Sequence, residues 1–315
     1  MLDSGAKATY PACAQQDGIL VLHKPAGPTS AACIARIKRH LGQKKIGHAG
    51  TLDPMASGVL LVLLGQGTKL SSHLTAAGEK VYAATVKLGE CTDTWDAEGR
   101  VQATGDYAGV TLEMVQEILS SWHGHTEQEV PPYSAAKHQG RPLYELARKG
   151  LEIPVKTNTV HISRVELEWI RLPQIRFRVR CSSGTYIRFL AHSLGMRLGC
   201  GAVLVELTRE YSHPFGISEA HDLEEVVSRP EDFASRIVPL SRALPAWPLI
   251  RLTDRQAALA RNGCALAHGE LSLDLTCAPG KKALLAGEND EPLALATGCV
   301  RNGKAHWAIV RGLWN

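Results

Sequence analysis

Short runs of apolar residues recur along the chain, separated by stretches rich in Gly, Pro and polar residues. Continuous apolar runs are typical of buried strands, and strict alternation of apolar and polar residues is typical of half-buried strands. Apolar residues spaced i, i+3, i+7 are typical of amphipathic helices. Thr29 or Ser30, just after a Pro- and Gly-containing turn, is expected to cap the first helix. The pattern predicts strands at residues 18–22, 59–64, 80–89 and 175–181, and helices at 31–41 and 112–121.

The composition changes in the last quarter of the chain. Pro245, Trp247 and Pro248 resemble a linker, and the residues after them combine short apolar runs with Gly-rich turns. Such a pattern is typical of small β-rich modules. We therefore expect a disordered tail at 1–17, a main domain at 18–244 and a small β-rich domain at 245–315.

Length and charge allow a sizeable core without identifying a partner. The chain has 315 residues, 44% of them hydrophobic, and a formal net charge of +4 with a pI near 8.6. This balance is compatible with a nucleic-acid partner, and many metabolic enzymes share it. The N-terminal residues contain no long apolar core, so we expect neither a signal peptide nor membrane contact, and a cytoplasmic location.

The sequence contains no recognisable metal or cofactor motif. Its eight cysteines are scattered without a Cys-x-x-Cys pair, so we expect buried thiols rather than a zinc site or a disulfide framework. No phosphate-binding Gly-rich motif of the nucleotide-binding kinds occurs. The prediction is therefore a protein without metal or cofactor.

Residues 47–58 place one carboxylate, Asp53, among small and turn-forming residues, directly before the apolar run at 59–64. Glycines permit tight backbone conformations, and Pro54 biases Asp53 away from helix. The segment is therefore predicted to be a tight loop packed against a buried strand. From the residues alone, Asp53 is either a turn residue that hydrogen-bonds its own backbone or a catalytic carboxylate.

Two basic clusters also have two interpretations each. Five cationic side chains lie within ten residues just before this loop, and three arginines share one face of the strand at 175–181. Each cluster is either a solvated surface or a contact for nucleic-acid phosphates. The residues are Arg36, Lys38, Arg39, Lys44 and Lys45 in the first cluster, and Arg176, Arg178 and Arg180 in the second.

Six segments, in chain order, resemble the motifs of the TruB family, the bacterial tRNA pseudouridine-55 synthases. They are residues 47–58, 80–89, 91–99, 131–137, 181–188 and 201–209. The match departs mildly at Ala49, where the family usually has Thr. It also departs at Ser183, where the family often has Lys, at His138, where it often has Tyr, and at Thr208, where it has Arg. The resemblance implies an α+β pseudouridine synthase fold with a mixed, mainly antiparallel sheet around a central cleft as the catalytic domain at 18–244. It also implies that the small β-rich domain at 245–315 is a PUA-like RNA-binding domain.

The resemblance also implies the roles of individual residues. Asp53 would be the essential catalytic residue, Tyr82 would stack on the target base, and Arg188 would pair with Asp53. From the residues alone, the alternative interpretation of Tyr82 is an ordinary core aromatic, because it lies in an alternating strand. Substrate-binding roles are implied for His48, Tyr186, Leu207, Lys24 and Arg209.

The implied reaction isomerises uridine-55 in the T-loop of tRNA, with extrusion of the base and no cofactor. The expected partner is thus the T-arm of tRNA, and the expected state is a monomer. A non-catalytic tRNA-binding or folding factor is the alternative. Two further carboxylates, Asp93 and Asp96, would suit a glycosidase, but their Asp- and Gly-rich surroundings favour a turn.

Overall fold

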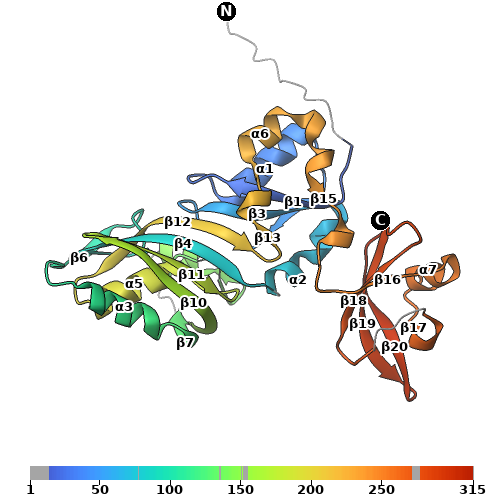
Figure 1. The fold of residues 1–315 in the computed structure, drawn as a ribbon. Coiled ribbons are helices and arrows are strands. Elements are labelled where there is room, and N and C mark those ends of the chain that lie inside the picture. Colours follow the sequence, from blue (N-terminus) through green and yellow to red (C-terminus); the bar gives the residue numbers. More distant parts are fainter. Residues whose placement is uncertain are drawn as a thin grey trace, which may run out of the picture.

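Two β-sheets dominate the computed structural model, which describes residues 14–76, 78–134, 136–149, 151, 155–271 and 277–314 (Figure 1). The larger sheet contains β1 (Gly18–Lys24), β2 (Ile46–Ala49), β3 (Ser57–Leu64), β4 (Lys80–Leu88), β7 (Gly124–Glu129), β10 (Thr157–Arg171), β11 (Gln174–Cys181), β12 (Ala202–Ser212), β13 (Phe215–Gly216), β14 (His221–Asp222) and β15 (Ile237–Val238). Its main path runs β14-β1-β3-β12-β4-β11-β10-β7. Most neighbours are antiparallel, while β1 with β14 and β3 with β12 are parallel. The predicted mixed, mainly antiparallel sheet is confirmed.

Helices pack on both faces of this sheet, and four of the α-helices cover one of them. The α-helices are α1 (Ser30–Leu41), α2 (Ser71–Ala76), α3 (Leu112–Ser121), α4 (Leu143–Arg148), α5 (Ile187–Arg197), α6 (Leu223–Ser228) and α7 (Asp254–Arg261). The 3-10 helices are η1 (Gly65–Leu70), η2 (Ile217–Glu219), η3 (Pro230–Asp232), η4 (Ala234–Arg236), η5 (Leu240–Arg242) and η6 (His268–Glu270). α1 and α6 pack on the half with β1 and β3, and α3 and α5 on the half with β4 and β11 (Figure 1). Within the described residues, no helix is both long and apolar enough to span a membrane.

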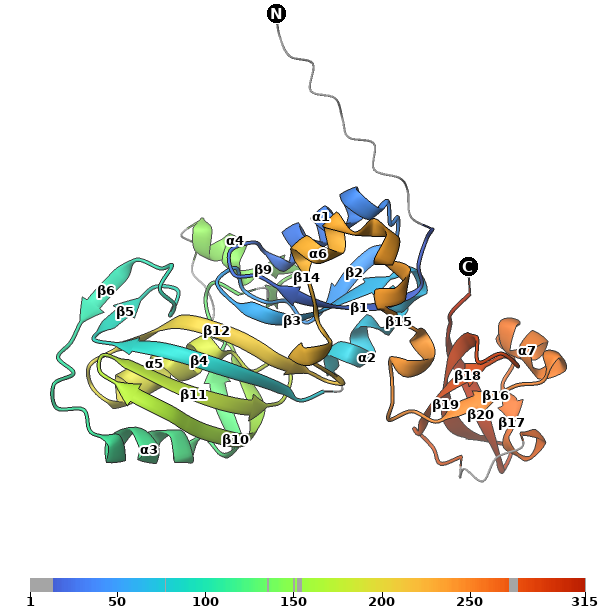
Figure 2. The ribbon, with the colours of Figure 1, turned by 45° about the horizontal axis from the view of Figure 1, so that its top comes forward.

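The C-terminal residues form a second sheet with a core of its own. Its strands are β16 (Leu249–Arg251), β17 (Leu266–Ala267), β18 (Lys282–Ala286), β19 (Pro292–Arg301) and β20 (Lys304–Gly312), in the order β16-β18-β19-β20-β17. Trp307 is completely buried in that core. The sheet is consistent with the predicted PUA-like module. A small hairpin of β5 (Glu90–Thr92) and β6 (Val101–Thr104) lies at the other end of the molecule (Figure 2), and β8 (Lys137–His138) pairs with β9 (Arg141–Pro142).

The two predicted helices are confirmed, and their local signals explain them. The Thr29 side chain accepts a hydrogen bond of 3.0 Å from the backbone N–H of Ala32 and so caps α1. Cys33, Ile37 and Leu41 form the buried stripe of this helix. The predicted strand at 59–64 belongs to β3, which is buried on both faces because its alternate residues enter two separate hydrophobic cores.

The arginine row of β11 meets carboxylates of this same chain. Like charges in a row repel unless anions offset them, and glutamates on β10, on β12 and directly before β4 provide those anions. This arrangement supports the interpretation as a solvated, ion-paired sheet face rather than as a phosphate contact. The pairs are Arg176–Glu168 at 2.9 Å, Arg178–Glu210 at 2.7 Å and Arg180–Glu79 at 3.0 Å.

Two smaller predictions need correction. Order begins before residue 18, because the Asp17 carboxylate accepts a hydrogen bond of 2.6 Å from the backbone N–H of Gln66. Residues 1–13 of the predicted tail lie outside the described residues. Not every cysteine is buried, since Cys264 is exposed.

Candidate active site

The loop that carries Asp53 connects β2 to β3 and is tied to the start of α1. The Ser30 hydroxyl accepts a hydrogen bond of 2.9 Å from the Leu52 N–H and donates one of 3.0 Å to the Leu52 carbonyl. The Ala56 N–H donates to the Asp53 carbonyl at 3.1 Å, which closes a turn. The Asp53 side chain therefore projects from a fixed turn and is 37% exposed.

Two buried cationic side chains, Lys24 and Arg209, donate hydrogen bonds to backbone carbonyls of this loop. The Lys24 ammonium donates to the carbonyls of Pro25, Pro54 and Ala56 at 2.8, 3.2 and 2.7 Å. Its side chain is completely buried, and burial is the main cause that lowers the pKa of Lys24. The prediction that Lys24 binds substrate is therefore corrected, because its ammonium lies beneath the loop and lines neither cavity beside Asp53.

Arg209 supports the same loop from β12. Its guanidinium donates to the carbonyls of Val59 and Gly50, both at 2.7 Å, and the residue is 1% exposed. Close approach of β3 to β12 makes these bonds reachable. Gly58 allows that approach, since a Cβ at its φ of +103° would lie 2.2 Å from the Arg209 carbonyl oxygen. Arg209 also lines a cavity beside Asp53, which is described below. It therefore supports the loop from the edge of that cavity.

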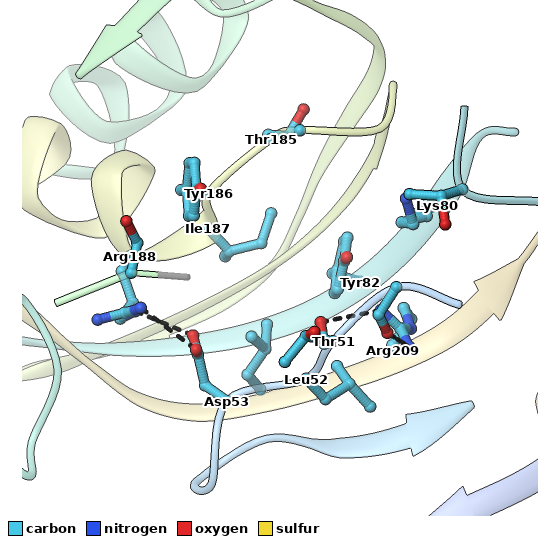
Figure 3. Close-up of a pocket in the computed structure, with 15 residues that line it drawn as sticks. Thr51, Leu52, Asp53, Lys80, Tyr82, Thr185, Tyr186, Ile187, Arg188 and Arg209 are labelled. Carbon is cyan, nitrogen blue, oxygen red and sulfur yellow. Dashed lines mark hydrogen bonds and ion pairs between the residues drawn. The ribbon is translucent and has the colours of Figure 1, made fainter. Parts of the chain in front are cut away.

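Arg188, in the first turn of α5, forms an ion pair with Asp53. Its Nε lies 3.0 Å from Oδ2 and its Nη2 lies 3.2 Å from Oδ1, so both carboxylate oxygens are engaged (Figure 3). The guanidinium also donates to the carbonyls of Thr94 at 3.2 Å and Tyr133 at 3.0 Å. A planar guanidinium held at several points fixes the direction of the carboxylate it binds.

A cavity of about 280 Å³ opens beside this ion pair. Asp53 and Arg188 lie at one end of it, and Tyr82 rises from β4 toward it (Figure 3). Tyr186 and Leu207 complete its walls. Six residues predicted for the site therefore meet here: Asp53, Tyr82, Arg188, Tyr186, Leu207 and Arg209.

Burial shifts the pKa values of three side chains that line the cavity, Tyr82, Tyr186 and Lys80. Tyr82 is 7% exposed, and burial raises the pKa of its phenol, which therefore stays protonated at neutral pH. Burial raises the pKa of Tyr186 in the same direction. Burial lowers the pKa of Lys80 to about 8, while its ammonium donates a hydrogen bond of 2.7 Å to the Ser183 hydroxyl. Lys80 lines the cavity, although its sequence context predicts no role for it.

His48 faces a different space from Tyr82. It lines a second cavity of about 580 Å³ on the other side of the Asp53 loop, together with Tyr133 and Asp96. Burial lowers the pKa of His48, with Arg209 adding to the effect. The two cavities share five lining residues, Thr51, Leu52, Asp53, Ser134 and Arg188, so the Asp53–Arg188 ion pair borders both of them.

Asp96 is the site residue that the sequence pattern concealed. We predicted a turn role for it, and its carboxylate does accept from the Thr94 hydroxyl and the Glu98 N–H. The residue is nevertheless 5% exposed, and Oδ2 lies 3.5 Å from Nη1 of Arg188. Its place in the segment that resembles a family motif was the only signal in the sequence, because an exposed aspartate and a buried aspartate in a turn have the same kind of local sequence.

Chemically, the site offers an oriented carboxylate next to an aromatic ring in a partly enclosed cavity. Such a carboxylate can act as a nucleophile or a base. No group of three or more His, Cys, Asp or Glu side chains suited to a metal occurs among the described residues.

Comparison with known proteins identifies the family. Residues 38–187 match the family described as TruB family pseudouridylate synthase (N terminal domain). The chain belongs to the TruB family of pseudouridylate synthases.

The relatives are similar over nearly the whole chain. The chain is 60% identical to tRNA pseudouridine synthase B of Nitratidesulfovibrio vulgaris (strain Hildenborough), and the match covers 96% of this chain and 99% of that protein. It is 57% identical to tRNA pseudouridine synthase B of Oleidesulfovibrio alaskensis, with coverage of 96% and 98%.

Solved structures agree with the fold. The chain resembles a protein chain in the crystal structure of a Cbf5-Nop10-Gar1 complex with a TM-score of 0.73 at 27% identity, covering 95% of this chain and 85% of that one. A chain in the archaeal box H/ACA sRNP Nop10-Cbf5 complex matches in fold with a TM-score of 0.69 at 24% identity, covering 95% and 86%.

Proposed function

We propose that this protein converts uridine-55 in the T-loop of tRNA to pseudouridine. The observation that carries the proposal is the Asp53 carboxylate, held at both oxygens by Arg188 beside a cavity walled by Tyr82. The name of its relatives, tRNA pseudouridine synthase B, supports tRNA as the substrate. The reaction breaks the N1–C1′ bond of the uridine, turns the base and rejoins it through C5.

In this proposal Asp53 starts the chemistry. Its carboxylate either attacks C1′ or removes the C2′ proton to give a glycal, and both routes need the oxygen to point at the sugar. Arg188 supplies that orientation, because it binds both carboxylate oxygens and is itself 4% exposed. Tyr82 would offer its ring to the extruded base, and its phenol oxygen would take the C5 proton, directly or through water, while a proton passes to N1 of the base.

The remaining site residues would bind the substrate around the flipped nucleotide. Tyr186 and Leu207 wall the cavity, and His48 lines the neighbouring one, where it would contact the disrupted T-loop. The basic cluster before the loop is a candidate for phosphate contacts, since Lys38, Arg39, Lys44 and Lys45 are exposed. Arg36 of that cluster pairs with Glu224. We further propose that the protein acts as a cytoplasmic monomer without a cofactor.

The test is tritium release from an unmodified tRNA labelled at uridine C5, in the presence of a metal chelator. The wild-type protein should release about one tritium per tRNA, and changing only uridine-55 should abolish release. Asp53→Asn keeps the size of the side chain but removes its negative charge and leaves one oxygen to accept from Arg188, and it should release none. Asp93→Asn is the matched control, because the Asp93 carboxylate accepts from the Arg100 N–H outside the cavities and should leave activity intact.

Each other outcome rejects the proposal in its own way. Tight tRNA binding without release by the wild type would favour the folding-factor alternative. Release of free uracil would favour a glycosidase. Release that persists in Asp53→Asn would remove Asp53 from the chemistry.

A further inference from the structure

A tryptophan with an unusual backbone conformation lies directly beside Arg188. Trp95 has a φ of +62°, in the left-handed region that bulky side chains rarely adopt. Both of its chain neighbours contact Arg188, Thr94 through its carbonyl and Asp96 through its carboxylate. A strained conformation persists only where the surrounding structure holds it. The contacts of Trp95 therefore bear on the site.

The Trp95 ring packs on the helix that carries Arg188. It stacks on His192, with ring centroids 4.7 Å apart and an angle of 8° between the planes. It also meets Phe189 edge to face at 6.1 Å. His192 lies four residues after Arg188 in α5, so the two side chains emerge one turn apart on the same face. The stack thus joins the 92–99 segment to α5 at the level of Arg188.

The backbone of Trp95 is fixed from the opposite side by β12. The Leu204 N–H donates to the Trp95 carbonyl at 3.1 Å, and the Ala97 N–H donates to the Leu204 carbonyl at 2.9 Å. The segment is therefore held between a central strand and α5.

The His192 ring is suited to packing rather than to proton chemistry. Burial lowers its pKa, which Glu129 offsets in part, so the imidazole is neutral near pH 7. Its Nδ1 is buried, and no described residue forms a hydrogen bond with it. Neither Trp95 nor His192 lines the cavities beside Asp53, so neither ring is placed to touch the substrate there.

We propose that Trp95 and His192 are positioning residues, whose stack holds the 94–96 backbone against Arg188 and through Arg188 orients the Asp53 carboxylate. The inference rests on the proposed function of Asp53 and Arg188. It assigns these rings to the rate of the chemical step and not to the affinity for tRNA.

The test compares variants that separate backbone strain from stacking. Trp95→Gly removes the ring but tolerates the positive φ, so the backbone has no steric reason to change. Trp95→Phe keeps an aromatic ring, and His192→Leu keeps bulk but loses the flat partner. Asn302→Gly is the matched control, because Asn302 also has a positive φ of 50° and is exposed in the turn between β19 and β20. Single-turnover rates, tRNA dissociation constants and melting temperatures are measured for each.

Trp95→Gly and His192→Leu should lower the single-turnover rate on the order of 10- to 100-fold, with tRNA affinity unchanged within about 2-fold. Trp95→Phe should recover most of the rate, and Asn302→Gly should match the wild type. Wild-type rates in both Trp95→Gly and His192→Leu overturn the inference and leave the proposed function standing. Loss of affinity equal to the loss of rate also overturns it, since that pattern indicates a general structural role. An inactive wild-type protein would instead reject the proposed function.

Discussion

At Arg188 the shape of the cation should matter as much as its charge. The guanidinium binds both oxygens of Asp53 and two backbone carbonyls at once, which a lysine ammonium cannot do. We expect Arg188→Lys to lower the single-turnover rate on the order of 100-fold while tRNA affinity stays nearly constant. Arg197→Lys, near the end of the same helix and exposed, is the control. A rate within a few-fold of the wild type would show that charge alone suffices.

Lys80 should make stability depend on pH in the alkaline range. Its pKa falls from 10.5 to about 8 in the folded protein because of burial, so the unfolded chain binds the extra proton between these values. The free energy of unfolding should therefore rise with pH across this range, as the cost of the buried charge is removed. That cost is fully present below about pH 8 and amounts to roughly 3 kcal/mol.

Lys80→Met measures this effect directly. Without the buried charge, the variant should be more stable than the wild type near neutral pH, by up to about 3 kcal/mol in urea unfolding. The difference should shrink as the pH rises through 8 toward 10.5. A difference that is constant over this range would mean that Lys80 keeps its ordinary pKa.

Lys24 should be a stability residue that also affects catalysis. Lys24→Met removes the only ammonium that the described structure places against the carbonyls of Pro25, Pro54 and Ala56. Buried carbonyls without donors are costly, so we expect a loss of about 2–4 kcal/mol in urea unfolding and a slower chemical step. Lys304→Met, exposed in the C-terminal sheet, should change neither. Weaker tRNA binding without loss of stability would return Lys24 to the substrate surface.

At the scale of the elements, the contact between β3 and β12 should be sensitive to added volume at Gly58. Gly58→Ala would bring its Cβ to 2.2 Å from the Arg209 carbonyl oxygen and force these strands apart beside the Asp53 loop. We expect a loss of about 1 kcal/mol from the backbone conformation and about 1–3 kcal/mol more from the overlap. The measurement is urea unfolding combined with the tritium-release rate.

Gly124→Ala provides a matched comparison for that substitution. Gly124 has a similar φ of +97°, but a Cβ there would have no neighbour within 4 Å. Only the backbone cost of about 1 kcal/mol should appear, and activity should persist. Equal losses in the two variants would show that the approach of β3 to β12 is not tight.

Elements that depend on local signals were predictable from the sequence. The Thr29 cap and the i, i+3, i+7 spacing fix α1, and strict alternation marks β11, because these interactions lie within a few residues of each other. The position of β12 between β3 and β4 was not predictable, since partner choice among strands depends on residues far apart in sequence.

The same distinction explains the site. Asp53 and Arg188 were predicted from their motifs, whereas the burial of Lys24 and Asp96 depends on what the rest of the chain places around them. A lysine at a strand end and an aspartate in a turn are ordinarily exposed. Nothing in their local sequence reveals the carbonyls or the guanidinium that justify their burial.

At the scale of the whole molecule, Lys69 of η1 connects the main domain to the end of the C-terminal sheet. Its ammonium donates to the carbonyls of Gly312 and Trp314, both at 2.9 Å. We expect Lys69→Met to increase amide hydrogen exchange at the end of β20 and to weaken tRNA binding a few-fold, with the saturating single-turnover rate unchanged. Lys304→Met, exposed on the same sheet, is the control. Unchanged exchange would mean that apolar contacts alone hold the C-terminal sheet.

The central place of β12 has a consequence for how the protein is made. β12 is encoded late, at residues 202–212, yet it fills the gap between β3 and β4, which come from the first 90 residues. While a ribosome is still synthesising the chain, the emerged segments hold Asp53 and Tyr82 but lack Leu207 and Arg209. The nascent protein should therefore be inert toward RNA and should expose two unpaired strand edges until this one segment is inserted. Translation should therefore pass residue 212 before catalysis begins, and a product that ends before β12 should not modify RNA.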